Sequence, residues 1–120
     1  MDGNFRMSPP GFQQVYVILA GFQDNPSSAL PMVYAFLQHK TTETYSELLN
    51  ALVRKCRTFN LEPNPARITI DFESAMLNAI RIVFGTDIVI HGCFYHLCQS
   101  TWKKIQDLGL VQRYESLEFY

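Results

Sequence analysis

Hydrophobic residues fill both faces of the first clear element of the chain. The run from Gln13 to Ala20 is β-branched and aromatic, which predicts a strand buried on both sides. Turn-forming residues dominate Gly21 to Ser28. A second strand is expected from Met32 to Leu37, with Pro31 at its entrance, where a missing N–H group does least harm. Two strands joined by a short loop predict an antiparallel hairpin.

The period of the hydrophobic pattern changes after Lys40. Apolar positions then recur at the spacing of one helical face, and they are Tyr45, Leu48, Leu49, Leu52, Val53 and Cys56. Thr42 is the expected N-cap, and Thr44 with Glu47 offers an alternative capping-box start. The helix is expected to stop before the segment from Asn60 to Pro65, which two prolines fix as a loop.

Short strands and helices alternate in the second half of the chain. The expected elements are a strand at Arg67–Ile70, a helix at Ser74–Phe84 stopped by Gly85, a strand at Ile88–Ile90 and a helix at Phe94–Leu108 closed by Gly109. Because the first of these helices is long enough for a crossover, the two short strands are expected to be parallel. The sequence therefore predicts an α/β fold, in which a mixed sheet carries helices packed on it.

Composition narrows the class of protein without deciding its function. With 120 residues, 48% hydrophobic and 18% charged, the chain is expected to form one compact domain. Ten Lys and Arg residues against eleven Asp and Glu residues leave a net charge of −1, so any DNA contact must be local or assisted. Three cysteines are too few for a disulfide framework, and no apolar run reaches the length of about 18 residues that a membrane span needs.

Asp71 is the first candidate for chemistry. It directly follows the apolar strand ending at Ile70, and open α/β sheets bind ligands at that edge. The alternative is an ordinary acid at the N-cap or in the first turn of the next helix, where Glu73 is also expected.

Asp2 gains a meaning only together with Asp71. By itself it is a turn residue before Gly3. If the two acids lie on neighbouring strands, their carboxylates repel each other unless a divalent cation lies between them. Mg²⁺ or Mn²⁺ suits such oxygen ligands.

Cys93 and His96 are three residues apart at an expected helix start, so their side chains can share one face. A closed zinc site needs four ligands, and the chain has no second Cys/His pair. Buried or hydrogen-bonded side chains are the alternative. Trp102, on an apolar face with Cys98 and Ile105, is expected in the core, and stacking on a nucleic-acid base is its alternative.

Six short motifs occur in order along nearly the whole chain. They are Asp2–Phe5, Leu30–Ala35, Thr42–Tyr45, Ile70–Glu73, Gly92–His96 and Trp102–Gln106. Taken together, the series resembles the transposase domain of Mutator-like elements (MULEs). The resemblance implies an RNase H-like fold with an Asp-Asp-Glu metal site that cuts and joins DNA.

The resemblance also assigns roles to single residues. Asp2 matches the first catalytic acid and Asp71 the second, so both are implied as ligands of Mg²⁺ or Mn²⁺. Cys93 and His96 match a Cys-x-x-His pair whose role we leave open. DNA at transposon ends is the implied partner, the nucleus is the implied location, and self-association into a homo-oligomer is compatible with the resemblance. No membrane association is implied.

The chain also departs from the family pattern. The third acid of the family, a Glu, follows further helical sequence after the Cys-x-x-His pair, and the sequence stops at Tyr120, with Glu115 and Glu118 too close to that pair. We therefore expect residues 1–120 to be a partial RNase H-like catalytic core, with weak metal binding and little strand transfer. The alternative from another class is a domesticated, non-enzymatic module that binds DNA or protein.

Overall fold

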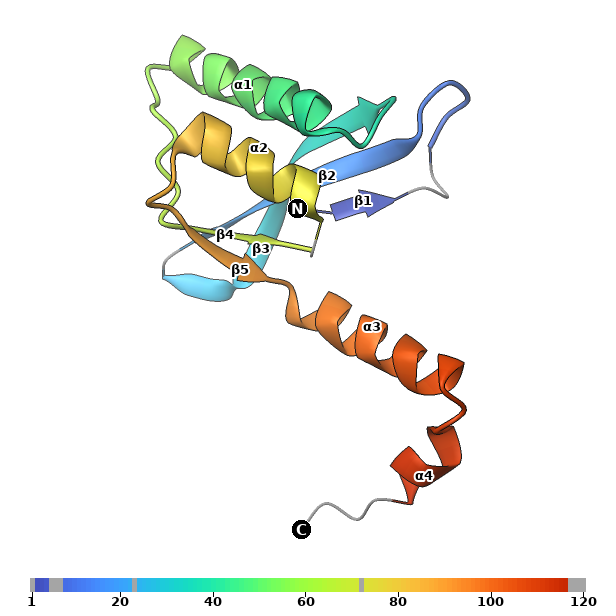
Figure 1. The fold of residues 1–120 in the computed structure, drawn as a ribbon. Coiled ribbons are helices and arrows are strands. Elements are labelled where there is room, and N and C mark those ends of the chain that lie inside the picture. The colour runs from blue at the N-terminus through green and yellow to red at the C-terminus, as the bar shows by residue number, and fades with distance from the viewer. Residues whose placement is uncertain (1, 5–7, 23, 72, 117–120) are drawn as a thin grey trace.

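The computed structural model describes residues 2–4, 8–22, 24–71 and 73–116 as a mixed α/β structure (Figure 1). Its elements are β1 (Asp2–Asn4), β2 (Gln14–Phe22), β3 (Asn25–Leu37), α1 (Thr42–Thr58), β4 (Arg67–Ile70), α2 (Ser74–Phe84), β5 (Val89–Gly92), α3 (Phe94–Asp107) and α4 (Val111–Glu115). The expected α/β class is confirmed, and so are the antiparallel hairpin and the parallel strand pair.

The first three strands form an antiparallel sheet in the order β1-β2-β3. β3 is longer than expected, since Phe22 pairs with Asn25 and the ladder runs through the segment we expected to be a turn. The turn lies within the expected segment Gly21 to Ser28 but is shorter, since it lies between Phe22 and Asn25 and the rest of the segment belongs to the strands. Among the strands that the structure describes, β3 is an edge strand with β2 as its hydrogen-bonded neighbour, which is why proline is tolerated in it. The register also shifts where Leu19 meets Pro31.

β4 and β5 form a second, parallel pair that α2 connects. Their register places Ile70 opposite Gly92, so both strands end at the same edge. In an RNase H-like order β1 lies beside β4; within the residues the structure describes, hydrogen bonds join β1 to β2 only. The RNase H-like order remains a prediction.

The N-cap of α1 lies one residue before the expected cap Thr42 and three residues before the alternative start Thr44. Thr41 is the N-cap, and its Oγ1 accepts a hydrogen bond from the backbone N–H of Thr44 at 3.2 Å. The expected N-cap at Thr42 and the alternative start at Thr44 are both wrong, because Thr41 has the extended backbone of an N-cap and Thr42 is already helical. The end of α1, before the two prolines, is confirmed.

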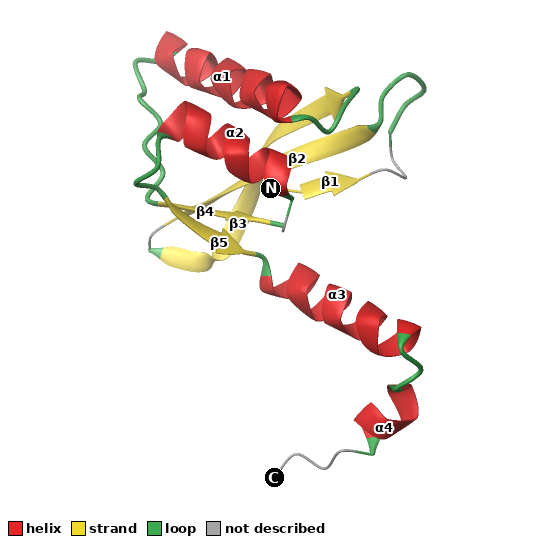
Figure 2. Ribbon diagram, viewed as in Figure 1, coloured by secondary structure: helices red, strands yellow, loops and turns green. Residues whose placement is uncertain are grey.

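The core lies between the strands and one layer formed by α1 and α2, which cover the same side of the strands (Figures 1 and 2). Both helices present an apolar stripe to it. The largest fully buried side chains are Tyr16, Tyr45, Leu49, Met76, Ile80 and Gln14. Gln14 is the one polar member of this set, and its contacts prove important for the pocket described below.

The third and fourth helices extend away from this body (Figure 1). No residue of α3 or α4 is buried, and the radius of gyration is 17.3 Å, against about 14 Å for a compact chain of this length. Trp102 contacts Tyr114 of α4 edge to face at 5.8 Å between ring centroids. The expectation that Trp102 lies in the core is wrong, because no strand or helix of the body covers this face of α3.

The described helices include none that is both long enough and apolar enough to cross a bilayer.

Two isoleucines of α2 provide a test of the packing between α2 and the sheet. Ile80 is fully buried, whereas Ile82 is 67% exposed. We expect Ile80→Ala to lower the free energy of unfolding by about 2–5 kcal/mol, because it leaves a cavity in the core. Ile82→Ala, its control on the same helix, should change it by less than about 0.5 kcal/mol. Urea unfolding followed by circular dichroism measures both, and equal losses would contradict this packing.

Candidate active site at the end of β4

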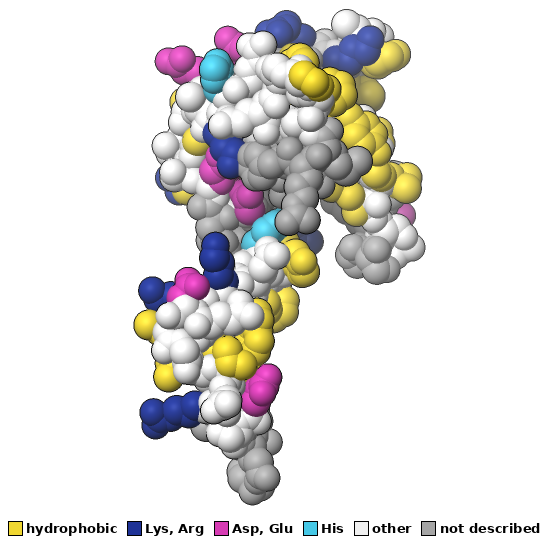
Figure 3. Space-filling model, turned by 90° about the vertical axis from the view of Figure 1, so that its right-hand side faces the viewer, with side chains coloured by type: hydrophobic (Ala, Val, Ile, Leu, Met, Phe, Trp, Pro, Cys, Tyr) yellow, Lys and Arg dark blue, Asp and Glu magenta, His cyan; other side chains and the backbone are white. Residues whose placement is uncertain are grey.

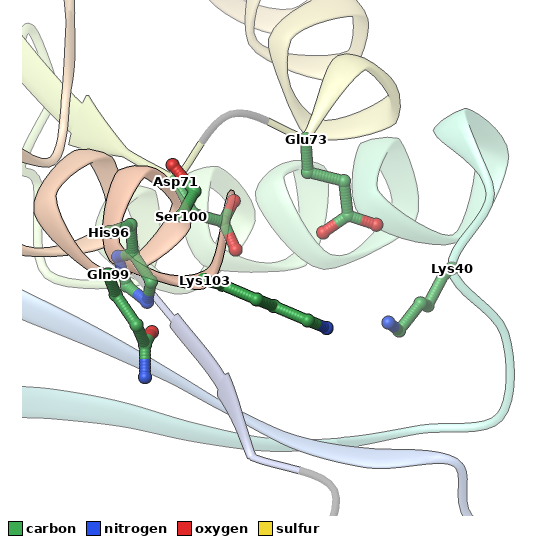
Figure 4. A pocket seen from close by; sticks show the side chains of 7 residues that line it. All are labelled: Lys40, Asp71, Glu73, His96, Gln99, Ser100 and Lys103. Carbon is green, nitrogen blue, oxygen red and sulfur yellow. The ribbon is translucent and has the colours of Figure 1, made fainter. Parts of the chain in front are cut away.

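A pocket of about 660 Å³ lies where the end of β4 meets the start of α3 (Figure 4). It is lined by Lys40, Asp71, Glu73, His96, Gln99, Ser100 and Lys103. These residues come from three regions of the sequence: the segment before α1, the turn between β4 and α2, and α3. Figure 3 shows side chains of both charges gathered where α3 leaves the body.

The parallel strand pair brings Asp71 and His96 to the same pocket. The backbone N–H of Cys93 donates to the carbonyl oxygen of Ile70 at 2.7 Å, which extends the pairing of β4 and β5 by one more bond. Asp71 follows Ile70, and Cys93 is the N-cap of α3. His96 lies in the first turn of that helix and therefore reaches the edge where Asp71 lies.

Asp71 does not cap the helix that follows it. The N-cap of α2 is Glu73, so the alternative of Asp71 as an N-cap or first-turn acid is wrong. The Oδ1 atom of Asp71 is buried and has no hydrogen-bond partner among the residues the structure describes. A buried carboxylate oxygen without a partner is costly in free energy, and a bound cation, a water molecule or another donor group would satisfy it.

Glu73 occupies the N-cap position of α2, yet its side chain makes no capping hydrogen bond. Instead, the hydroxyl of Tyr45 donates to Glu73, at 2.8 Å from Oε1 and 2.9 Å from Oε2. Gln14 Nε2 donates to the same hydroxyl oxygen at 2.9 Å. Because Tyr45 accepts from Gln14, its single O–H proton is directed to Glu73. This series of hydrogen bonds fixes the Glu73 carboxylate in the pocket wall.

The environment of Tyr45 keeps its hydroxyl protonated. Burial is the largest cause and raises the pKa of Tyr45 well above its usual value. The hydrogen bond from Gln14 lowers this pKa, and the hydrogen bond to Glu73 and the charges of Glu73 and Asp71 raise it. The ring of Tyr45 is fully buried and packs against Tyr16 at 5.4 Å between centroids. Tyr45 is therefore a permanent hydrogen-bond donor to Glu73.

The Cys93 thiol lies at the positive end of α3. The backbone N–H of His96 is the main cause that lowers the pKa of this thiol, with smaller contributions from the His96 side chain and from Tyr95. The sulfur is half-buried and does not close a capping hydrogen bond. Cys93 and His96 thus share one helix start, as the sequence predicts, and His96 lines the pocket.

The metal-ligand set is not complete within the part of the chain that the structure describes. Those residues contain no group of three His, Cys, Asp or Glu side chains placed to hold a metal ion. Asp2 begins β1, where its backbone lies opposite Val17 of β2. The side chain of Asp2 lies outside the described residues, so its distance from the Asp71 carboxylate stays a prediction.

Comparison with known proteins decides the family. Residues 1–100 match the family model of the MULE transposase domain. The chain belongs to the MULE transposase family. No curated protein and no solved structure matches this MULE domain. The match includes Asp2, Asp71, Cys93 and His96, and all the residues that line the pocket except Lys103.

Of the residues that line the pocket of this MULE domain, sequence reasoning singled out Asp71 and His96 and missed the rest. It also missed the role of Tyr45 behind Glu73. Tyr45 reads as one more apolar position of a helical stripe, and Glu73 reads as an ordinary first-turn acid. Their hydrogen bond joins residues 28 positions apart. A tyrosine on an apolar stripe was the available signal, since a buried hydroxyl needs a partner.

Alkaline unfolding tests the environment of Tyr45. In the unfolded chain Tyr45 has its ordinary pKa of 10.0, and in the folded chain its pKa is higher. Folding stability is therefore complete below about pH 10 and falls as the pH rises further, by up to about 1.4 kcal/mol per pH unit. Tyr45→Phe should remove this part of the alkaline loss, as measured by urea unfolding at increasing pH. Tyr34→Phe, on the exposed face of β3, is the control, and an unchanged pH slope in Tyr45→Phe would contradict the assignment.

Proposed function

We propose that the pocket is part of the catalytic site of a DNA transposase with an RNase H-like core, which cleaves and joins DNA phosphodiesters with Mg²⁺ or Mn²⁺. Membership of the MULE family supports a transposase-related function and DNA binding by the complete enzyme. The observation that carries the proposal is the buried Oδ1 atom of Asp71 at the carboxyl end of β4. That atom has no partner among the described residues, and a hard divalent cation is a partner it suits.

In this proposal Asp71 and Asp2 hold the ion in the complete enzyme. When bound, Mg²⁺ or Mn²⁺ activates water or a 3′ hydroxyl and stabilises the leaving oxygen in phosphodiester transfer. The chain's own residues hold the site in shape, since β4–β5 pairing fixes Asp71 next to the start of α3. Cys93 and His96 belong to the same site, and we assign them no chemical step. The nucleus is the proposed location of the complete enzyme.

A non-enzymatic module that binds DNA or protein is the second candidate. The observation in its favour is that the described residues hold no group of three metal-ligating side chains. Such a module keeps the pocket but needs no cation at Asp71. Metal binding therefore separates the two candidates.

Titration with Mn²⁺ tests the role of Asp71. We expect weak binding by the chain, and binding weaker by at least about tenfold in Asp71→Asn, because a ligand carboxylate is lost. Asp107→Asn is the matched control, since it removes the same charge at the last residue of α3, outside the pocket. Electron paramagnetic resonance of free Mn²⁺ measures both variants.

Equal Mn²⁺ affinity in the wild type and Asp71→Asn would contradict the metal site and leave the non-enzymatic module. The chain is also expected to show little DNA strand transfer by itself. Efficient Mn²⁺-dependent cleavage of supercoiled DNA, abolished in Asp71→Asn, would contradict that expectation of low activity while supporting the site.

A further inference from the structure

One face of α3 continues from the pocket away from the body. His96, Gln99 and Lys103 line the pocket at helical spacings of three and four residues, so they form one stripe. Figure 4 shows the Lys103 side chain reaching across the pocket toward Lys40, with Glu73 on the wall of α2. The stripe ends in a cation, and its other members can donate hydrogen bonds.

Lys103 makes no ion pair within the part of the chain that the structure describes, although Glu73 lines the same pocket. Opposite charges that share a pocket attract each other, and flexible side chains usually allow them to meet. Here the Glu73 carboxylate accepts hydrogen bonds from Tyr45 on both oxygens instead. If the carboxylate moved to Lys103, the buried Tyr45 hydroxyl would lose its acceptor, and an unsatisfied buried hydroxyl is costly in free energy.

The hydrogen bond to Glu73 is built into the core. Tyr45 is fully buried and Gln14 is 1% exposed, so neither side chain can turn to water. Gln14 directs the Tyr45 proton to Glu73, as shown above. The carboxylate is therefore held on the α2 side of the pocket, and the ammonium group of Lys103 is not neutralised by it.

We propose that the stripe of His96, Gln99 and Lys103 binds the phosphate backbone of a DNA strand, and that Tyr45 keeps Glu73 from pairing with Lys103. The inference rests on the proposed function for the identity of the ligand. Phosphate oxygens are recognised by cations and by amide or ring N–H donors, which this stripe supplies. The contact needs no metal ion, which separates it from the chemistry proposed at Asp71.

Two neighbouring lysines of α3 provide the first test. Lys103 lines the pocket, whereas Lys104, the next residue, does not. Lys103→Ala and Lys104→Ala each remove one positive charge, so they differ only in whether that charge lies in the pocket. Binding to a fluorescent duplex of about 20 base pairs is measured in EDTA at several salt concentrations. We expect Lys103→Ala to weaken binding by about five- to tenfold near 0.1 M salt and to reduce the salt slope by about 0.9, the value for one phosphate contact. Lys104→Ala should change the affinity by less than about twofold and leave the salt slope unchanged.

Release of Glu73 provides the second test. Tyr45→Phe keeps the ring but removes the hydrogen bonds to Glu73, so the carboxylate becomes able to pair with Lys103. We expect weaker metal-free DNA binding, by about three- to tenfold, although no positive charge is removed. The double variant Tyr45→Phe/Glu73→Gln should regain wild-type affinity, because its amide cannot neutralise Lys103. A destabilised fold would lower both variants together, so the rescue distinguishes the two causes.

Glu73→Gln alone keeps the test decisive if Tyr45→Phe does not fold. A carboxylate that Tyr45 already holds away should matter little, so affinity should change by less than about threefold. Tightening by tenfold or more would show that Glu73 pairs with Lys103 in the wild type and would overturn the proposal. Equal losses in Lys103→Ala and Lys104→Ala, or no metal-free binding by the wild type, would also overturn it. Asp71→Asn should retain metal-free binding, so failure of the metal site leaves this result unaffected.

Discussion

The buried hydroxyl of Tyr45 connects the parts of the molecule that form the pocket. It accepts from Gln14 of β2, belongs to α1, and donates to Glu73 at the start of α2. The ring of the same residue packs on Tyr16 in the core. One side chain thus connects a strand, a helix and the start of a second helix.

This arrangement is sensitive because Gln14 and Tyr45 are buried and Glu73 is half-buried. A buried amide or hydroxyl without a partner costs about 1–3 kcal/mol, and a buried carboxylate costs more. Removal of the Tyr45 hydroxyl takes this partner from both Gln14 and Glu73, so the network depends on that one group. The same property that makes the network costly to disrupt holds Glu73 in one orientation. The position of Glu73 in the pocket wall is therefore a consequence of the hydrogen bonds that satisfy Gln14 and Tyr45 in the core.

Local sequence signals predicted the elements whose limits are set by single residues. The strand Arg67–Ile70 and the helix Ser74–Phe84 are confirmed to the residue, because proline precedes the strand and Gly85 stops the helix. The length of β3 could not be predicted, since turn-forming residues at its start are held in the ladder by pairing with β2. The Tyr45–Glu73 hydrogen bond could not be predicted from the sequence either, because it depends on how α1 and α2 pack against each other.

In the candidate site, too, local sequence predicted single features, while their arrangement depends on tertiary packing. The strand end identified Asp71, and the spacing of Cys93 and His96 identified a shared helix start. Their common pocket depends on the parallel register of β4 and β5, which Cys93 extends by its bond to Ile70. Apolar spacing placed Trp102 in the core, but spacing gives only the face of a helix and not what that face contacts.

The near-neutral charge of the chain is compatible with a phosphate-binding surface because the structure sorts its charges locally. Asp71 and Glu73 lie on one side of the pocket, in the loop after β4, while Lys103 approaches from α3. Electrostatic attraction to phosphate depends on charges within about a Debye length of 8–10 Å, not on the sum over the whole chain. A net charge of −1 therefore says little about this pocket. What the hydrogen bonds from Tyr45 change is the direct contact: they hold the Glu73 carboxylate where it does not form an ion pair with Lys103, so the ammonium group keeps its donors for a phosphate.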